Sequence, residues 1–282
     1  MPDTIALNVE NARPSLRDAA KGHIQAEAVS IVFGSGPSAH VAVDKASLDV
    51  KPGEFVCILG PSGCGKSTLL NAVAGYIKPT IGRVSLDGVP IETPGPDRGM
   101  VFQQYSLFPW KTVRENVAFG PRLAGHSAIE ATRTANTFLA MVGLSAFADR
   151  YPEELSGGMK QRVGIARALG NYPSVILMDE PFGALDAQTR AMMQENLLGI
   201  WSKFNNTVLF ITHDVDEAVF LADRVVVMSA SPGRIIADIP VELERPRDFE
   251  ITTDPRFVEI KKQCVEVIRA ETLKAFEQQS KG

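Results

Sequence analysis

The stretch "CILGPSGCGKSTLLN", Cys57 to Asn71, decides the fold. It begins inside "EFVCILG", a short continuous apolar run of the kind that forms a strand buried in a mostly parallel sheet. Helix-forming residues predict a helix from Lys66 through about Val73. The stretch therefore predicts a buried strand, a tight glycine-rich loop and a helix in immediate succession.

The loop matches the pattern G-x-x-x-x-G-K-S/T as Gly60, Gly65, Lys66 and Ser67. Glycines let successive backbone N–H groups point toward one polyphosphate, and the N-terminus of the following helix adds partial positive charge. We expect Lys66 to reach the β- and γ-phosphates and Ser67 to bind Mg²⁺. Cys64, inside the loop, is either a small filler or a thiol whose pKa the helix N-terminus lowers. The residues predicted to contact the nucleoside triphosphate are Gly60, Pro61, Ser62, Gly63, Cys64, Gly65, Lys66, Ser67 and Thr68.

Size and charge limit the class of protein. The chain has 282 residues, 45% of them hydrophobic, enough to bury a full globular core. Its net charge of −4 leaves no basic excess, which argues against DNA or RNA as a direct partner. Three cysteines at irregular spacings fit neither a disulfide framework nor a zinc site and suit a reducing cytosol. Because no apolar run approaches the length of a membrane span and the polar start has no signal-peptide core, we expect any membrane role to be peripheral.

Strand and helix patterns alternate along the chain and predict an α/β core. Alternation in "HIQAEAVSIVF" and "HVAVDKASLDV" predicts antiparallel strands, and Asp87-Gly88 predicts the turn of a hairpin. A long helical signal from about 113 to 169 predicts an inserted subdomain. Further buried strands are expected at 175–179, 207–212 and 224–228, with helices at 187–204, 215–222 and near 255–276.

Two carboxylates end the predicted strand "VILMDE". Ligands of α/β sheets bind at the carboxyl ends of the strands, so Asp179 is placed to coordinate Mg²⁺ and Glu180 to polarise an attacking water. A structural role, in which both residues cap the next element, is equally open from this pattern alone. The phosphate loop favours the catalytic interpretation.

A second anion site is predicted at "LSGGMKQR", Leu155 to Arg162, where a serine and two glycines lead into a helix, although Ser is also a common N-cap. The octet resembles the signature motif of ABC transporter ATPases. "GPSGCGKST", "VILMDEP", "GALD" and the His of "THD" resemble that family's other motifs, in the same order. A resemblance this specific covers about residues 24–228.

The resemblance implies a P-loop ATPase fold with a RecA-like core, an antiparallel β subdomain and an inserted helical subdomain at about 105–168. A tail would occupy 1–22, the ATPase domain 23–240, and a linker with a helix 241–282. It also implies that ATP and Mg²⁺ lie between two copies of the chain arranged head to tail. Each phosphate loop would then face Ser156, Gly157 and Gly158 of the other copy.

The same resemblance assigns further roles by motif position. Gln103 would sense Mg²⁺ and the attacking water, and His213 would contact the γ-phosphate, although a lone His after a strand is more often structural. Asp186 of "GALD" would lie in the loop that crosses to the partner copy. Phe33 would stack on adenine; the alternative is a core phenylalanine of an edge strand.

An apolar cluster of Leu107, Phe108 and Trp110 in "YSLFPWKTVRENVAFG" predicts a docking surface, with filling of the subdomain junction as the alternative. In the ABC family this region receives a helix of the membrane subunit. "LFPWKTVRENVAFG", "ERPRD" and "DPRFVEIKKQ" resemble the ATPase subunits of nitrate, taurine and aliphatic sulfonate importers. The resemblance implies an ATP-hydrolysing subunit on the cytoplasmic face of the membrane, bound to permease subunits and linked indirectly to a substrate-binding protein.

Alternatives to this importer function are the ATPase of an exporter, a soluble ABC ATPase of repair or translation, and a small-molecule kinase. A kinase would leave "LSGGMKQR" and "GALD" unexplained, and a repair or translation protein would have a long coiled-coil insertion or a second cassette.

Overall fold

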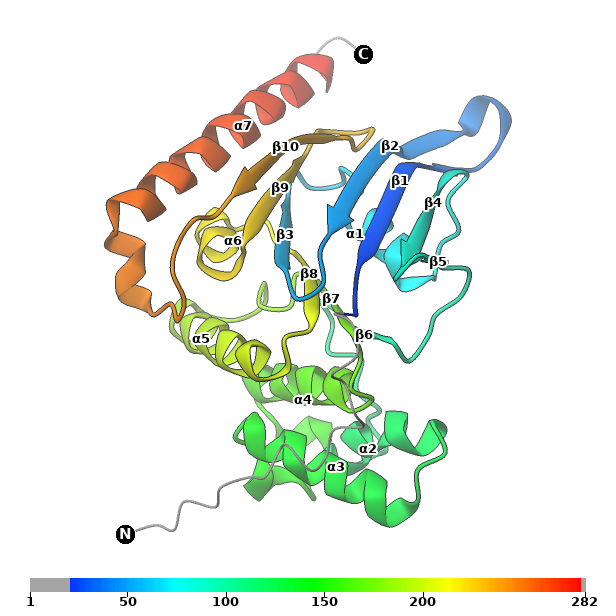
Figure 1. Ribbon diagram of the computed structural model, residues 1–282, viewed down its shortest axis with the longest axis vertical. Helices are drawn as coiled ribbons and strands as arrows, with labels where there is room; N and C mark the ends of the chain where they lie inside the picture. Colours follow the sequence, from blue (N-terminus) through cyan, green and yellow to red (C-terminus); the bar gives the residue numbers. More distant parts are fainter. Residues whose placement is uncertain (1–20, 280–282) are drawn as a thin grey trace.

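The computed structural model describes residues 21–279, so almost all of the predicted N-terminal tail lies outside the described residues. Its centre is a six-stranded sheet in the order β10-β9-β3-β8-β7-β6 (Figure 1). β10 pairs antiparallel with β9, and all other pairs in this sheet are parallel. The strands are β3 (Phe55–Leu59), β6 (Arg98–Val101), β7 (Val175–Asp179), β8 (Thr207–Ile211), β9 (Arg224–Met228) and β10 (Ile235–Pro240).

Burial on both faces explains why the central strands are continuously apolar. Every residue of β3 and of β8 is buried. Because successive side chains of a strand point to opposite faces, those of β3 alternate between two hydrophobic clusters. One cluster includes residues of α5 (Ala187–Phe204) and α6 (Val215–Leu221), and the other includes residues of α1 (Lys66–Ala74) and the smaller sheet. The six-stranded sheet is therefore the middle layer of three.

The smaller sheet is antiparallel, as predicted, with strands in the order β2-β1-β4-β5. Its strands are β1 (Ile24–Phe33), β2 (His40–Val50), β4 (Ile81–Leu86) and β5 (Val89–Pro90). The predicted hairpin is confirmed: Asp87 and Gly88 join β4 to β5 with φ angles of 52° and 78°. Positive φ at both central residues is the backbone of a two-residue turn that follows the twist of the flanking strands.

The predicted helical insertion consists of α2 (Val113–Leu123), α3 (Ala128–Met141) and α4 (Gly157–Leu169), between β6 and β7. These helices form the lower part of the molecule in Figure 1. Capping boxes fix where the first two begin: Thr112 pairs with Glu115 in α2, and Ser127 pairs with Glu130 in α3.

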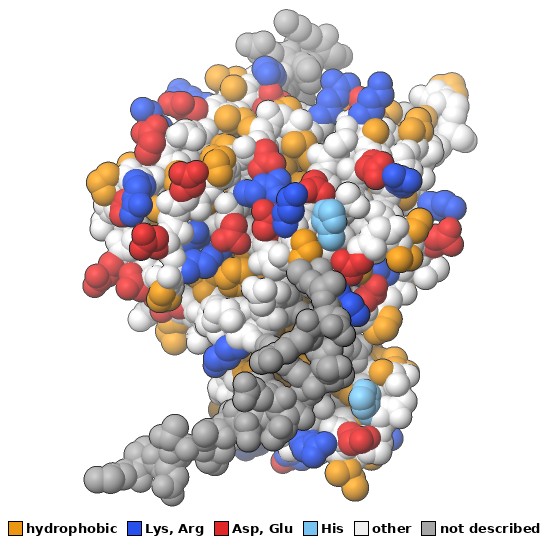
Figure 2. Space-filling view, in the orientation of Figure 1, with side chains coloured by type: hydrophobic (Ala, Val, Ile, Leu, Met, Phe, Trp, Pro, Cys, Tyr) orange, Lys and Arg blue, Asp and Glu red, His pale blue; other side chains and the backbone are white. Residues whose placement is uncertain are grey.

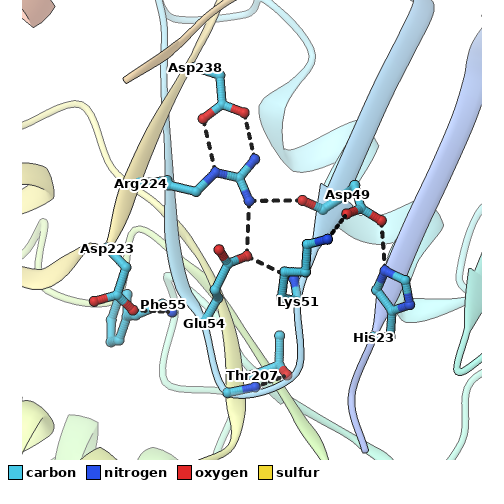
Figure 3. A network of polar contacts seen from close by, with 10 residues as sticks. His23, Asp49, Lys51, Glu54, Phe55, Thr207, Asp223, Arg224 and Asp238 are labelled. Carbon is cyan, nitrogen blue, oxygen red and sulfur yellow. Dashed lines mark hydrogen bonds and ion pairs between the residues drawn. The ribbon is translucent and has the colours of Figure 1, made fainter. Parts of the chain in front are cut away.

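Charged residues tie the two sheets together at one end (Figure 3). Arg224 of β9 donates to the Asp49 carbonyl of β2 at 2.9 Å, to Glu54 Oε2 at 2.9 Å and to Asp238 Oδ1 of β10 at 3.0 Å. The Asp49 carboxylate lies 2.6 Å from His23 Nε2. This hydrogen bond lowers the pKa of Asp49 below its usual value. The network joins His23, the segment from Asp49 to Glu54 around the β2–β3 turn, Arg224 of β9 and Asp238 of β10.

The C-terminal helix α7 (Pro255–Gln279) lies beside α6 and the β10 edge of the large sheet (Figure 1). The chain reaches it through Arg247, whose buried guanidinium donates to the carbonyls of Val219, Phe220 and Ala222 at 3.2, 3.0 and 2.8 Å. Burial lowers the pKa of Arg247 to about 10. The linker is thus anchored on the C-terminal end of α6, where a cation also complements the helix dipole.

Two strands, β6 and β10, were not predicted. β6 has only four residues, and β10 is an edge strand that ends just before the predicted linker, which begins at residue 241. The boundaries proposed at residues 22 and 240 stay predictions. Among the described residues, the structure contains no helix whose length and apolarity would suffice to span a membrane. Acidic and basic side chains are intermixed over the upper part of the face shown in Figure 2.

Candidate nucleotide site

The phosphate loop joins β3 to α1, as the sequence predicts. Gly65, the N-cap of α1, has a φ of 100°, and a Cβ there would lie 2.5 Å from the Ala42 carbonyl oxygen. Glycine is required both for the left-handed backbone and for the close approach of β2. The first turn of α1 contains no acidic residue, so the helix N-terminus is free to face an anion.

Lys66 is a buried cation, with 6% of its surface exposed. Its Nζ donates to the carbonyls of Gly60 and Pro61 at 2.8 and 2.9 Å, and no carboxylate pairs with it among the described residues. A buried charge without a counter-ion is costly, so this position suits a bound anion. The cradle therefore fits the phosphates of a nucleotide.

The structure decides between the two interpretations of Cys64, a small filler or a thiol with a lowered pKa. The side chain is 1% exposed, and its burial raises the pKa of the thiol above the usual value. Lys66 and the backbone lower this pKa, but desolvation is the larger effect. Cys64 is therefore a small core filler of the loop rather than an activated thiol.

Two hard oxygen ligands lie together beside the loop. Ser67 Oγ donates to Asp179 Oδ1 at 2.9 Å, where Asp179 ends β7. Burial raises the pKa of Asp179, the Ser67 hydrogen bond opposes this, and the neighbouring Glu180 raises it further. Hydroxyl and carboxylate oxygens suit Mg²⁺, which commonly takes its remaining ligands from water and phosphate. Among the described residues there is no cluster of three or more acidic, His or Cys side chains that could hold a metal by itself.

Glu180 contacts two other predicted site residues, Gln103 and His213. Its Oε2 lies 3.4 Å from Gln103 Nε2 and 3.1 Å from His213 Nδ1. Gln103 follows β6 and His213 follows β8, so the adjacent parallel strands bring the three side chains to one edge of the sheet. The structure records Gln103 against Glu180 rather than against Ser67 or Asp179.

The backbone of Glu180 is unusual for a non-glycine residue, with a φ of 43°. Its N–H donates to the Ile211 carbonyl of β8 at 3.0 Å, which holds this conformation. Non-glycine residues in this region carry strain, and such residues cluster at active sites. The backbone thus fixes the Cα–Cβ direction of Glu180, and the contacts with Gln103 and His213 orient its carboxylate.

The signature residues and Asp186 lie at helix N-termini. Ser156 is exposed and caps α4, accepting from the Met159 N–H at 3.3 Å, so the capping interpretation is correct for the single chain. Asp186 caps α5, and the Thr189 N–H lowers the pKa of its carboxyl. In Figure 1, α4 lies in the lower helical part and α1 lies behind the strands of the upper part. A single chain therefore does not bring Ser156, Gly157 and Gly158 to its own phosphate loop.

Phe33 ends β1, and 45% of its surface is exposed. The alternative of a core phenylalanine is therefore wrong. The Phe33 ring is available for a ligand.

The predicted docking segment around Leu107, Phe108 and Trp110 is held in place by Asn116, a residue whose role was not predicted from the sequence. The buried Asn116 of α2 accepts from the Phe108 N–H at 2.8 Å and donates to the carbonyls of Phe108, Lys111 and Thr112. Phe108 packs against Phe119, with ring centroids 4.6 Å apart, whereas Trp110 is 72% exposed. Phe108 and Leu107 thus partly fill the junction, and Trp110 is left at the surface.

A second missed residue, Arg167 of α4, joins the same segment to the signature helix. Its Nη1 donates to the Ser106 carbonyl at 2.6 Å, and its guanidinium lies 5.8 Å from the centroid of the Phe108 ring. A cation following "LSGGMKQR" by five residues was the only sequence signal.

Comparison with known proteins gives the family. A family model described as ABC transporter matches residues 43–183. The nitrate import ATP-binding protein NrtD of Synechococcus elongatus is 47% identical over 251 residues, covering 88% of this chain and 92% of that protein. The chain belongs to the ABC transporter ATPase family. The taurine import ATP-binding protein TauB of Rhizobium johnstonii is 49% identical over 246 residues, covering 86% of this chain and 93% of the relative.

A solved structure supports the fold of this ABC ATPase. A dimeric ATP-binding cassette in a post-hydrolysis state with ADP and Pi matches with a TM-score of 0.69 and 33% identity, covering 78% of this chain and 100% of that one. The predicted P-loop ABC fold and the assignment as an ATPase are therefore confirmed.

Proposed function

We propose that this ABC ATPase powers a membrane importer of a small anion such as nitrate, taurine or another sulfonate. The relatives with these names support the choice of substrate class. The observation that carries the catalytic part is the meeting of Gln103, Glu180 and His213 beside the Ser67–Asp179 pair.

ATP would bind at the phosphate loop, where the buried Lys66 has no carboxylate partner among the described residues. Lys66 and the backbone N–H groups of residues 60–68 would hold the phosphates, and Phe33 would stack on adenine. Ser67 and Asp179 would hold Mg²⁺, and Gln103, which contacts the adjacent Glu180, would sense the ion and the attacking water. When bound, this ion supplies positive charge against the phosphate oxygens.

Hydrolysis would require a water in line with the γ-phosphate. Glu180 would polarise this water, and His213 and Gln103 would hold the Glu180 carboxylate in place. Lys66 would stabilise the charge that develops on the phosphoryl group. Ser156, Gly157 and Gly158 of a second copy would complete the site, and Asp186 would reach toward that copy.

The docking partner would be a pair of permease subunits that contact Leu107, Phe108 and Trp110. Exposed aromatic residues beside partly buried ones are typical of interface anchors. ATP-driven closure of two copies would move the docked permease between its inward- and outward-facing states. The chain would then work at the cytoplasmic face of the membrane, with a substrate-binding protein engaged only through the permease.

The substitution Glu180→Gln tests this mechanism. We expect kcat to fall by about 10²–10⁴-fold while ATP binding persists and ATP stabilises a dimer seen by gel filtration. Arg83→Ala, which breaks an exposed ion pair with Glu27 in the small sheet, is the control and should keep full activity. Near-normal hydrolysis by Glu180→Gln would contradict the assigned base.

The substrate class is tested in proteoliposomes that contain the ATPase, its permease and its binding protein. Loading the binding protein with nitrate, taurine or an alkyl sulfonate should stimulate ATP hydrolysis for one class. No stimulation by any of these anions would overturn the proposed substrate without affecting the ATPase assignment.

A further inference from the structure

Arg190 bonds two loops that flank the candidate site. It lies one turn into α5, directly after the "GALD" loop, Gly183–Asp186. Its Nη2 donates to the Leu185 carbonyl at 3.0 Å, and its Nη1 lies 3.3 Å from Asp214 Oδ2. Leu185 precedes Asp186, and Asp214 follows His213. One guanidinium therefore joins the loop predicted to cross to the partner copy and the loop that carries His213.

Both oxygens of the Asp214 carboxylate make a contact in this arrangement. Its Oδ1 accepts from the Glu217 N–H at 3.1 Å and caps α6, while Oδ2 faces Arg190. The Asp214 N–H in turn donates to Thr212 Oγ1 at 3.0 Å. The residues on both sides of His213 are therefore held from outside this loop: the Thr212 N–H donates to the Ile58 carbonyl of β3 at 3.3 Å, and Arg190 contacts Asp214.

The guanidinium lies against the candidate site as well as between the loops. The Arg190 side chain is 29% exposed, and its Nε is buried with no hydrogen-bond partner among the described residues. Arg190, Glu180 and His213 line a cavity of about 10 Å³, the size that one water needs. Arg190 thus lines the same small cavity as the proposed base.

A separate contact already packs α5 on α6. Gln194 Nε2 donates to Glu217 Oε1 at 2.8 Å, and both side chains are at most 5% exposed. Burial raises the pKa of Glu217. The Gln194–Glu217 side-chain contact involves neither the Leu185 carbonyl nor Asp214 Oδ2, and Glu217 reaches Asp214 only through its backbone N–H at Oδ1. A change at Gln194 alone therefore serves as the packing control for Arg190.

We propose that Arg190 is a positioning residue that makes the "GALD" loop and the His213 loop move as one unit. Formation of the dimer at Asp186 would then be coupled to placement of His213 against Glu180 and the γ-phosphate. This inference rests on the proposed roles of His213 and Asp186. A guanidinium is needed because a lysine has no fork that reaches a carbonyl and a carboxylate together.

The test compares Arg190→Gln, Asp214→Asn and the double variant. Asn at 214 still caps α6 but loses the charge that faces Arg190. Since small displacements of reacting groups can cost about 10²-fold in rate, we expect kcat to fall by about 10- to 100-fold in each single variant. ATP affinity of the isolated monomer should stay unchanged. The double variant should be no slower than the slower single one, because both remove the same contact.

Two further variants separate positioning from folding. Arg190→Lys should show an intermediate kcat, because it keeps the charge opposite Asp214 and loses the bridge to Leu185; it also serves if Arg190→Gln fails to fold. Gln194→Leu, the packing control, should lower Tm more than Arg190→Gln does while keeping kcat within about threefold of the original.

Three results would overturn the proposal. The first is a kcat of Arg190→Gln within about twofold of the original. The second is a double variant in which the losses in kcat of the two single variants are fully additive. The third is a loss in kcat that follows the loss in Tm equally in Arg190→Gln and Gln194→Leu. His213→Ala is measured in parallel. If His213→Ala is active, the proposed function of that residue fails; if it is inactive and Arg190→Gln is active, only this inference fails.

Discussion

Replacing Asn116 with Ala should destabilise the chain and distort the docking segment. The Asn116 side chain is fully buried, and it accepts from the Phe108 N–H and donates to three carbonyls at 3.0 to 3.2 Å. Its loss leaves a partly buried N–H without a partner, which costs about 1–3 kcal/mol. It also removes the hydrogen bonds donated by the two amide N–H groups, which the three carbonyls share, at about 1 kcal/mol for each N–H. Allowing for relaxation of the loop toward water, we expect a loss of about 2–4 kcal/mol.

Thermal unfolding measures this loss, which corresponds to a fall in Tm of about 3–7 °C for a chain of 282 residues. Asn136→Ala, on the exposed side of α3, is the matched control and should change the stability by less than about 0.5 kcal/mol. Capture of the permease by the folded Asn116→Ala protein should also weaken, because Phe108 and Trp110 lose their fixed loop. A Tm within about 1 °C of the unchanged protein would refute the reasoning.

Three other substitutions or modifications test separate parts of the structure. Ser156→Arg should abolish hydrolysis and leave ATP binding by the monomer intact; unchanged turnover would contradict a site shared between two copies. Cys64 should react with iodoacetamide at pH 8 more slowly than a free thiol, because its burial raises its pKa, and labelling at the free-thiol rate would show that the loop opens. The hydrogen bond from His23 lowers the pKa of Asp49 in the folded state. The ionised carboxylate therefore stabilises the fold above about pH 3.8, and this stabilisation is lost as the pH falls through the lower pKa of the folded state. Asp49→Asn should flatten the pH dependence of urea unfolding below that pH, and an unchanged slope would count against this linkage.

The parts of the site that the sequence predicts are those built from consecutive residues. The phosphate loop needs glycines, a lysine and a hydroxyl at fixed spacing, so the pattern from Gly60 to Ser67 and its flanking strand and helix were all predictable. The Asp87-Gly88 hairpin was predictable for the same reason, since its turn chemistry is local.

The parts that could not be predicted depend on contacts between distant segments. Arg167 meets Ser106 across 61 residues, and Arg190 meets Asp214 across 24, so no local spacing marks either pair. The pKa of Cys64 was open because desolvation and the nearby Lys66 act in opposite directions, and only the burial of the folded loop decides between them. The edge strand β10 shows neither a strict polar–apolar alternation nor a continuous apolar run, because Asp238 and Pro240 interrupt its apolar residues, so its pattern did not predict a strand.

The central claim is that one chain holds only half of the residues that hydrolyse ATP. It is tested most directly by measuring the ATPase rate per chain over a dilution series, with the oligomeric state followed by ultracentrifugation at each concentration. We predict that the rate per chain falls toward zero as the dimer dissociates, and that it recovers on concentration. A constant rate per chain down to concentrations where only monomer remains would contradict the account.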